Sequence, residues 1–267
     1  MKLFMYLILG FIQGFTEPIP VSSSGHLVIF NSILNVEAFK DLNFEIITNF
    51  GSFIAIVYFY RKEIISIIKD FFMYIKTKEN KYYENFRYAL LIIVATIPAG
   101  IFGLLLKDTI ERITSVKIVG VSLLITAVLI LLVSNIKGTK EKKDITFVDA
   151  LIIGLFQVIA LFPGISRSGS TLVGGMSRDL KRDTAFKFSF MLYLPISMAT
   201  MVLSVKDLVT SSNADSLFLP YTLGMFVAMV VTYFSIKWFK KVMENGKLAY
   251  FAYYCIIMGI ITILFLK

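Results

Sequence analysis

Six long apolar segments dominate the chain and constrain its fold more than any other feature. They cover about 44–60, 88–106, 117–136, 188–205, 217–236 and 248–266. A helix needs about 20 mostly apolar residues to cross a bilayer, so each segment is long enough or nearly so. The composition agrees, because 57% of the residues are hydrophobic and 17% are charged, whereas soluble domains average about 45–50% and about 25%. We therefore expect an all-α integral membrane protein.

Two further apolar stretches, 3–30 and 147–176, are each interrupted in the middle. Prolines, glycines and serines occupy 17–26 in the first and 163–171 in the second, and such runs break a helix. Each remaining half is short for a full crossing. We expect two re-entrant helical hairpins, which join six spanning helices in a polytopic bundle that forms a single membrane domain, 1–267.

Basic residues are concentrated in four connecting segments. Segment 61–87 carries seven Lys and Arg, and 137–146, 177–187 and 237–247 carry four each, of 27 in the chain. The positive-inside rule places these segments in the cytoplasm and both termini outside, so the net charge of +9 indicates no nucleic-acid partner. The first hairpin then enters from outside and the second from the cytoplasm. Segment 62–76 is expected to lie along the cytoplasmic interface as an amphipathic helix.

An internal repeat relates the two hairpins. A shift of 144 residues gives six identities within 7–28 and no gap, pairing Leu7 with Leu151, Gly10 with Gly154, Gln13 with Gln157, Ser22 with Ser166, Ser24 with Ser168 and Gly25 with Gly169. Each half, about 1–136 and about 147–267, then holds one hairpin and three spans. Three crossings per half invert the second copy. In such inverted repeats the site lies where the broken helices meet near the bilayer midplane.

The first interruption carries several chemically active groups. Gln13 and Glu17 are four residues apart and share one helical face. An ionisable group in an apolar stretch should face a cavity, a cation or a positive partner, unless Glu17 ends a helix at the water surface. Hydroxyls such as those of Ser22 and Ser23, together with free backbone N–H groups at a helix start, bind anions, above all phosphate. His26, favoured in its neutral form there, suits a base or nucleophile, although a lone histidine can also be structural.

The second interruption repeats the serines and adds an arginine, Arg167. A guanidinium holds phosphate oxygens in a bidentate fork, although Arg167 could also form a structural ion pair with Glu17 and the small residues could simply allow close helix packing. The combined set of carboxylate, amide, hydroxyl, imidazole and guanidinium groups is typical of phosphoryl chemistry with a hard divalent cation. Cys255 and His26 are the only residues of their types, which excludes a disulfide framework and a Cys- or His-rich zinc site.

These residues resemble the undecaprenyl-diphosphate phosphatase family, also called the bacitracin-resistance family. Its signatures are an (E/Q)-x-x-x-E motif leading into P-V-S-S-[ST]-G-H, and P-G-x-S-R-S-x-x-T. Here they are represented by 13–17, 20–26 and 163–171. The length, the motif spacing and the hydrophobic profile match over essentially the whole chain. Some members have Glu at the position of Gln13, and an amide cannot be an anionic metal ligand.

The resemblance implies hydrolysis of undecaprenyl diphosphate to undecaprenyl phosphate and inorganic phosphate at the outer face of the bacterial cytoplasmic membrane. That reaction recycles the lipid carrier of cell-wall synthesis and confers resistance to bacitracin. A lipid-carrier flippase that uses the same site without hydrolysis is the main alternative, and an anion channel is a weaker one. A homodimer is left open.

The resemblance also implies roles for the residues of both motifs. The diphosphate would be bound by Arg167, Ser166, Ser168, Thr171, Ser22 and Gly25. Glu17, which also counts as catalytic, and Gln13 would position Mg²⁺ or Ca²⁺. His26 and Ser23 would provide the nucleophile and its base, with the order left open.

Overall fold

The computed structural model describes residues 2–34, 42–210 and 214–266, and within them the chain is helical with no β-strand. The all-α prediction is thereby confirmed. The helices are α1 (Lys2–Thr16), α2 (Ser23–Leu34), α3 (Leu42–Thr77), η2 (Asn80–Tyr82), α4 (Tyr83–Ile113), α5 (Val116–Val133), η3 (Lys142–Asp144), α6 (Phe147–Ile159), α7 (Arg167–Ser177), α8 (Arg182–Thr210), α9 (Ala214–Glu244) and α10 (Ala249–Phe265).

In the described ranges, four helical segments are long and apolar enough to cross a membrane. They are Asn80–Leu106, Val116–Val133, Arg182–Val202 and Phe218–Glu244. Each overlaps one of the predicted spans. The other two predicted spans, 44–60 and 248–266, are also helical, within α3 and the 17-residue α10. The protein is therefore a helical membrane protein with several spans, and the count of six stays a prediction.

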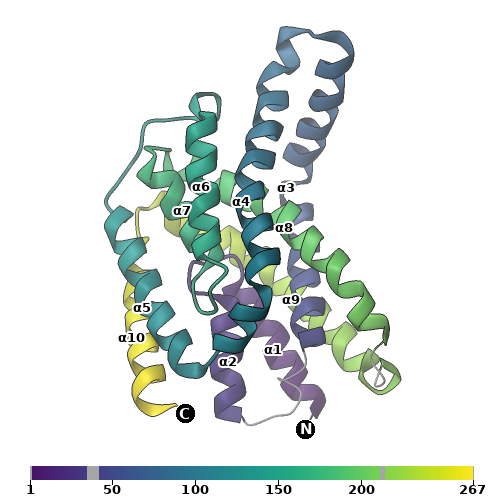
Figure 1. Cartoon of the computed structure of the whole chain (residues 1–267), viewed down its shortest axis with the longest axis vertical. Helices are drawn as coiled ribbons and strands as arrows, with labels where there is room; N and C mark the ends of the chain where they lie inside the picture. Colours follow the sequence, from purple (N-terminus) through teal and green to yellow (C-terminus); the bar gives the residue numbers. More distant parts are fainter. Residues whose placement is uncertain (1, 35–41, 211–213, 267) are drawn as a thin grey trace.

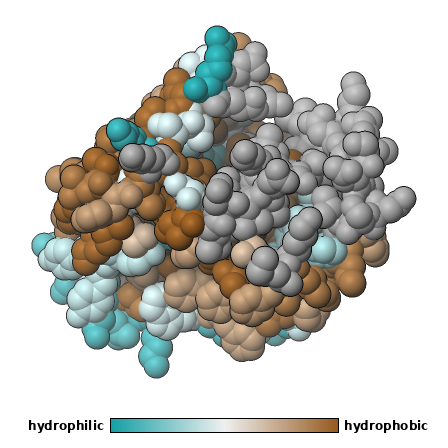
Figure 2. Space-filling model, turned by 90° about the horizontal axis from the view of Figure 1, so that it is seen from below, coloured by the Kyte–Doolittle hydropathy of each residue, from teal (hydrophilic) through white to brown (hydrophobic). Residues whose placement is uncertain are grey.

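Large hydrophobic side chains cover much of the outside of the bundle. Leu105 is 72% exposed and Leu132 is 70% exposed. Figure 2, which views the molecule from below relative to Figure 1, shows hydrophobic residues over much of the coloured surface. Because soluble monomers rarely expose large contiguous apolar patches, this surface is suited to lipid.

Both predicted helix breaks are present. The first falls between α1 and α2 and the second between α6 and α7, so each interrupted stretch forms a helical hairpin. Figure 1 shows that the α1–α2 hairpin opens toward the end that carries both termini and the α6–α7 hairpin toward the opposite end. The chain reverses with positive φ at Ser22 (67°) and Gly164 (89°). The two reversals touch, because a Cβ added to Gly25 would lie 3.0 Å from the Cα of Gly164.

The four basic segments lie together at the end away from the termini (Figure 1). Arg87 donates a hydrogen bond to the Lys143 carbonyl at 2.9 Å, and the Lys140 backbone N–H donates to the Asp179 carbonyl at 2.9 Å. Arg182 then reaches the Ser134 carbonyl at 2.8 Å. These bonds join three of the four segments directly, and the contact of Gly246 with Arg182 adds the fourth. The charge pattern therefore predicted correctly which connections share one end.

The prediction of a separate interfacial helix over 62–76 was wrong. These residues are the second half of α3, which continues unbroken to Thr77 and pairs with α4. Phe71 stacks on Phe86 with ring centroids 5.3 Å apart, and Asn85 donates to the Asp70 carboxylate. The basic pair at 61–62 does not stop the helix, because Arg and Lys are good helix formers. The α3–α4 pair projects beyond the rest of the bundle (Figure 1).

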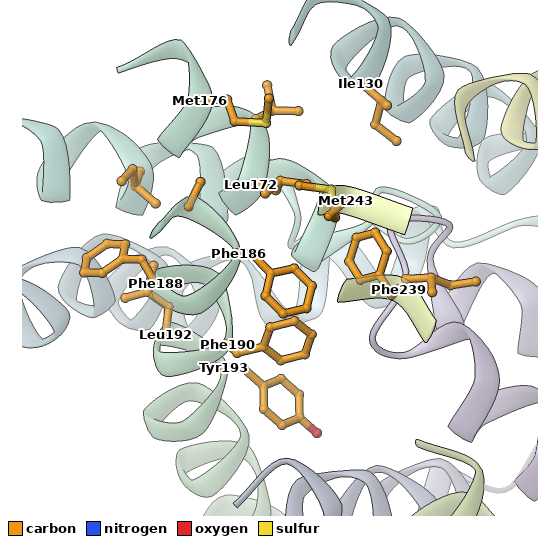
Figure 3. Packing of buried hydrophobic residues seen from close by; sticks show 14 of the residues in the cluster. Ile130, Leu172, Met176, Phe186, Phe188, Phe190, Leu192, Tyr193, Phe239 and Met243 are labelled. Atoms are coloured by element: carbon orange, nitrogen blue, oxygen red, sulfur yellow. The ribbon is translucent and has the colours of Figure 1, made fainter. Parts of the chain in front are cut away.

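An aromatic column on α8 connects the core to the middle of the bundle. Phe186 contacts Phe190 at 4.8 Å and Phe239 at 5.2 Å between ring centroids. Figure 3 shows Phe186, Phe190 and Tyr193 in succession along α8, with the Tyr193 hydroxyl directed away from the apolar rings. The packed side fixes α8, and the hydroxyl end of the column reaches the polar residues described next.

Candidate active site

A polar cavity of about 200 Å³ lies where the two helix reversals meet. The first hairpin contributes Glu17, Ser22, Ser23 and Ser24, the second contributes Ala160, Ile165, Ser166, Arg167 and Ser168, and α3 contributes Glu45 and Asn49. The structure thus brings residues of both motifs to one place, as the repeat predicted. The two residues from α3, Glu45 and Asn49, were not predicted to belong to the site.

Glu17 is the centre of the polar contacts. One carboxylate oxygen, Oε1, accepts a hydrogen bond from Arg167 Nη2, which makes a buried ion pair between the two hairpins. The other, Oε2, accepts from Gln13 Nε2 at 2.9 Å and from the Ser23 hydroxyl. Such a pair tolerates burial only when further hydrogen bonds satisfy its oxygens, and Gln13 and Ser23 supply two of them.

Arg167 is the first residue of α7 and remains partly accessible from the cavity. Its Cζ atom lies 4.1 Å from the centroid of the Tyr193 ring, and Nη1 donates to the Ser197 hydroxyl at 3.2 Å. Stacking on one face and a hydrogen bond at one nitrogen fix the plane of the guanidinium. Its side chain is 23% exposed and lines the cavity, so an anion in the cavity can approach the guanidinium.

The loop between α1 and α2 (the first serine loop) and the loop between α6 and α7 (the second serine loop) have the same local hydrogen bonds. Ser22 Oγ accepts from the Gly25 N–H at 3.2 Å, and Ser166 Oγ accepts from the Gly169 N–H at 3.1 Å. These side chains cap α2 and α7, and the helix starts point at the cavity from two sides. Because a helix N-terminus presents N–H groups and a partial positive charge, the pair forms an environment for a multiply charged anion.

Four predicted site residues do not line the cavity. Gln13 lies four residues before Glu17 and donates to its carboxylate from Nε2. The Gln13 Oε1 atom has no hydrogen-bond partner in the described chain. Gly25 packs against the second loop, and the Thr171 hydroxyl donates back to the Arg167 carbonyl at 3.0 Å. His26 is 1% exposed and lies behind the first loop.

Glu45 and Asn49, which lie one turn apart near the start of α3, were not among the predicted site residues. Asn49 Oδ1 accepts from the Tyr193 hydroxyl at 2.8 Å, so α3 and α8 are joined beside the cavity. The signal was available, because a carboxylate and an amide inside the predicted span 44–60 are as unusual in an apolar segment as Glu17 is.

The chain is similar to known proteins over nearly its whole length. The sequence model of the family described as bacitracin resistance protein BacA matches residues 6–261. Undecaprenyl-diphosphatase 1 of Bacillus cereus is 44% identical over 262 residues, which cover 98% of this chain and 97% of that protein. Undecaprenyl-diphosphatase 1 of Bacillus licheniformis is 43% identical over 267 residues, with 98% of each covered. The undecaprenyl-diphosphatase of Oceanobacillus iheyensis is 41% identical over 264 residues, covering 98% and 96%.

Proposed function

Because the chain belongs to the bacitracin resistance protein BacA family, we propose that it hydrolyses undecaprenyl diphosphate to undecaprenyl phosphate and inorganic phosphate. The observation that carries the proposal is the meeting of two capped helix starts, Arg167 and Glu17 at one polar cavity inside an apolar bundle. The reaction recycles the cell-wall lipid carrier and removes the diphosphate on which bacitracin acts. Nothing in the site favours the flippase alternative, since transport alone needs no serine hydrogen-bonded to a carboxylate.

The diphosphate is bound between the two hairpins. The free N–H groups of Arg167 hold its oxygens, and the hydroxyls of Ser22, Ser24, Ser166 and Ser168 with the α2 and α7 starts complete the shell. All of these groups line the cavity. Thr171 and Gly25 act indirectly, by shaping α7 and the contact between the loops.

Ser23 is the nucleophile in this proposal and Glu17 receives its proton. The Ser23 hydroxyl lines the cavity and already donates to Glu17 Oε2. As Ser23 Oγ bonds to the terminal phosphorus, the bond from that phosphorus to the oxygen of undecaprenyl phosphate breaks. Water then releases inorganic phosphate from the serine. Arg167 balances the negative charge that grows on the phosphoryl oxygens.

His26 has a supporting role in this account, although the sequence left it as an alternative nucleophile or base. The observation behind this choice is that His26 does not line the cavity and both of its ring nitrogens are engaged. Nδ1 lies 2.7 Å from the Ser22 carbonyl oxygen and Nε2 lies 2.6 Å from the Tyr254 hydroxyl.

In this proposal the divalent cation lies on the α3 side of the cavity, where Glu17 and Glu45 are the carboxylates of the lining. Glu17 already accepts three hydrogen bonds and Gln13 lies outside the cavity, which makes this pair a poor first choice of ligands. Glu45 lines the cavity, and no hydrogen bond or ion pair joins its carboxylate to another described residue. We therefore assign Mg²⁺ or Ca²⁺ to Glu45, with Glu17 nearby. When bound, the ion would neutralise charge on the diphosphate oxygens.

An inverted repeat accounts for the contacts around the site. The first hairpin packs on α9, where a Cβ on Gly10 would lie 2.3 Å from the Gly224 carbonyl oxygen. Its counterpart Gly154 packs on α4 in the same way, 2.4 Å from the Ala95 carbonyl oxygen. These matching contacts support halves of about 1–136 and about 147–267, of which 1, 35–41, 211–213 and 267 fall outside the described residues.

The cavity faces outward from the cytoplasmic membrane in this proposal. Glu45 and Asn49 belong to the first turns of α3, which starts at the end with the termini and runs toward the basic segments (Figure 1). Since the positive-inside rule assigns the basic end to the cytoplasm, the α3 side of the cavity is nearer the outer face.

Phosphate release separates the enzyme from a transporter. Purified protein in detergent receives undecaprenyl diphosphate, with Mg²⁺, with Ca²⁺ or with a chelator. We expect inorganic phosphate to appear only with protein and a divalent cation. A folded sample that releases none would favour transport, and a liposome flipping assay would then follow.

A further inference from the structure

The C-terminal helix contacts the first motif through Tyr254. Its hydroxyl lies 2.6 Å from His26 Nε2, and the two rings are nearly parallel, 9° apart with centroids at 5.6 Å. The partners are 228 residues apart and come from α10 and α2. Tyr254 does not line the cavity, and His26 is the residue that its hydroxyl contacts there.

The hydrogen bonds define which nitrogen of His26 carries the proton. Nδ1 lies 2.7 Å from the Ser22 carbonyl oxygen, which can only accept, so Nδ1 must donate. In the neutral imidazole Nε2 then has the lone pair, and the Tyr254 hydroxyl is its donor. Both hydrogen-bonding positions of the ring are therefore filled by the protein.

His26 in turn fastens the serine loop. The Ser22 carbonyl accepts from both Nδ1 and the backbone N–H of His26, the latter at 3.1 Å. Ser22 has a φ of 67°, which is unfavourable for a residue with a Cβ and persists only where neighbours hold it. The three serines at and after this bend, Ser22, Ser23 and Ser24, all line the cavity.

A second contact from α10 supports the same loop. The Cys255 thiol lies 3.8 Å from the Pro20 carbonyl oxygen, directly beside the Tyr254 contact. The second loop has a corresponding support from α5, where Thr126 Oγ1 accepts from the Ser166 N–H at 3.2 Å. The two supporting helices pack on each other, since a Cβ on Gly259 would lie 2.8 Å from the Gly120 carbonyl oxygen.

We propose that Tyr254 is a positioning residue: by donating to His26 Nε2 it fixes the imidazole that holds the Ser22 bend and thereby the nucleophile Ser23. The effect on turnover rests on the proposed function, whereas the hydrogen bond itself does not. Helix α10 then supports the reaction indirectly, because it positions His26 although none of its residues lines the cavity.

The test uses Tyr254→Phe with Tyr253→Phe as the matched control, because Tyr253 is the adjacent tyrosine and is 54% exposed. His26 is the only histidine in the chain, so ¹⁵N-histidine labelling and purification through a histidine-free tag give one imidazole spectrum. We expect wild type and Tyr253→Phe to show a protonated Nδ1 and a hydrogen-bonded Nε2, and Tyr254→Phe to shift Nε2. The kcat of Tyr254→Phe should fall about 10–100-fold with KM unchanged.

Three results would overturn the proposal. The first is a wild-type spectrum with the proton on Nε2, which needs no variant to fold. The second is an unchanged His26 spectrum in Tyr254→Phe, and the third is a shifted spectrum with full turnover. Phosphate release by the wild type in the same preparation distinguishes these failures from a failure of the proposed function.

Discussion

Arg167 and Glu17, which are 150 residues apart in the sequence, form an ion pair between the two hairpins. The pair closes one side of the cavity in which the serines of both loops meet. A buried pair of this kind contributes little net stability, because desolvation offsets the attraction, but it fixes the relative position of the groups that form it. Its value here lies in aligning the two loops.

Replacing Arg167 by Lys tests whether the bidentate hydrogen-bonding geometry of the guanidinium matters, because the positive charge is kept. Lysine keeps the positive charge but loses the stacking on Tyr193 and the bidentate geometry. We expect kcat/KM for phosphate release to fall about 100-fold, since one lost charge-stabilising donor costs about that much. Arg61→Lys, at an exposed arginine on α3, should retain wild-type rates. Equal rates in both variants would contradict the role of Arg167.

Neighbouring serines in the first loop should differ in importance. The Ser23 hydroxyl donates to Glu17, whereas the Ser24 hydroxyl, within the described residues, lies near only the Ser22 hydroxyl, at 3.5 Å. Ser23→Ala should therefore abolish turnover, and Ser24→Ala should cost only about tenfold, the scale of one lost hydrogen bond. Steady-state phosphate release measures both. A Ser23→Ala protein with substantial activity would exclude the proposed nucleophile.

Much of this arrangement could be predicted from local sequence features. The helix breaks follow from prolines and glycines, the shared basic end follows from charge, and the meeting of the loops follows from the repeat. Glu45 and Tyr254 could not be assigned in the same way, because their roles depend on neighbours that only the folded bundle supplies. The error at 62–76 has a similar origin, since the pairing with α4 decides where that helix continues.

Replacing Glu45 should change the cation concentration that the enzyme needs for activity. Removing its charge by Glu45→Gln leaves the side-chain shape intact but weakens an oxygen ligand for Mg²⁺ or Ca²⁺. We expect the cation concentration for half-maximal activity to rise about tenfold or more, by analogy with other ligand changes at metal sites. Glu79→Gln, at a residue exposed near the tip of the α3–α4 pair, is the control. An unchanged cation dependence in Glu45→Gln would remove this residue from the cation site.

The glycine contacts of the two hairpins predict a stability effect that is independent of catalysis. A Cβ at Gly10 or Gly154 would overlap the backbone of the facing helix, whereas a Cβ at Gly100 meets nothing within 4 Å. Overpacking of this kind costs about 1–3 kcal/mol, so Gly10→Ala and Gly154→Ala should lower the unfolding temperature in detergent. Gly100→Ala should leave it unchanged or raise it, because alanine favours helix. Equal behaviour of all three variants would contradict the close helix approach.

Both loops together should form one phosphatase site, and phosphorus NMR of undecaprenyl diphosphate with purified protein is the decisive measurement. We expect the wild type to convert the diphosphate to equal amounts of undecaprenyl phosphate and inorganic phosphate. We expect Ser23→Ala, in the first loop, and Arg167→Ala, in the second, each to lose this conversion while remaining monodisperse. Unconverted diphosphate with a folded wild type, or full conversion by either variant, would contradict this expectation.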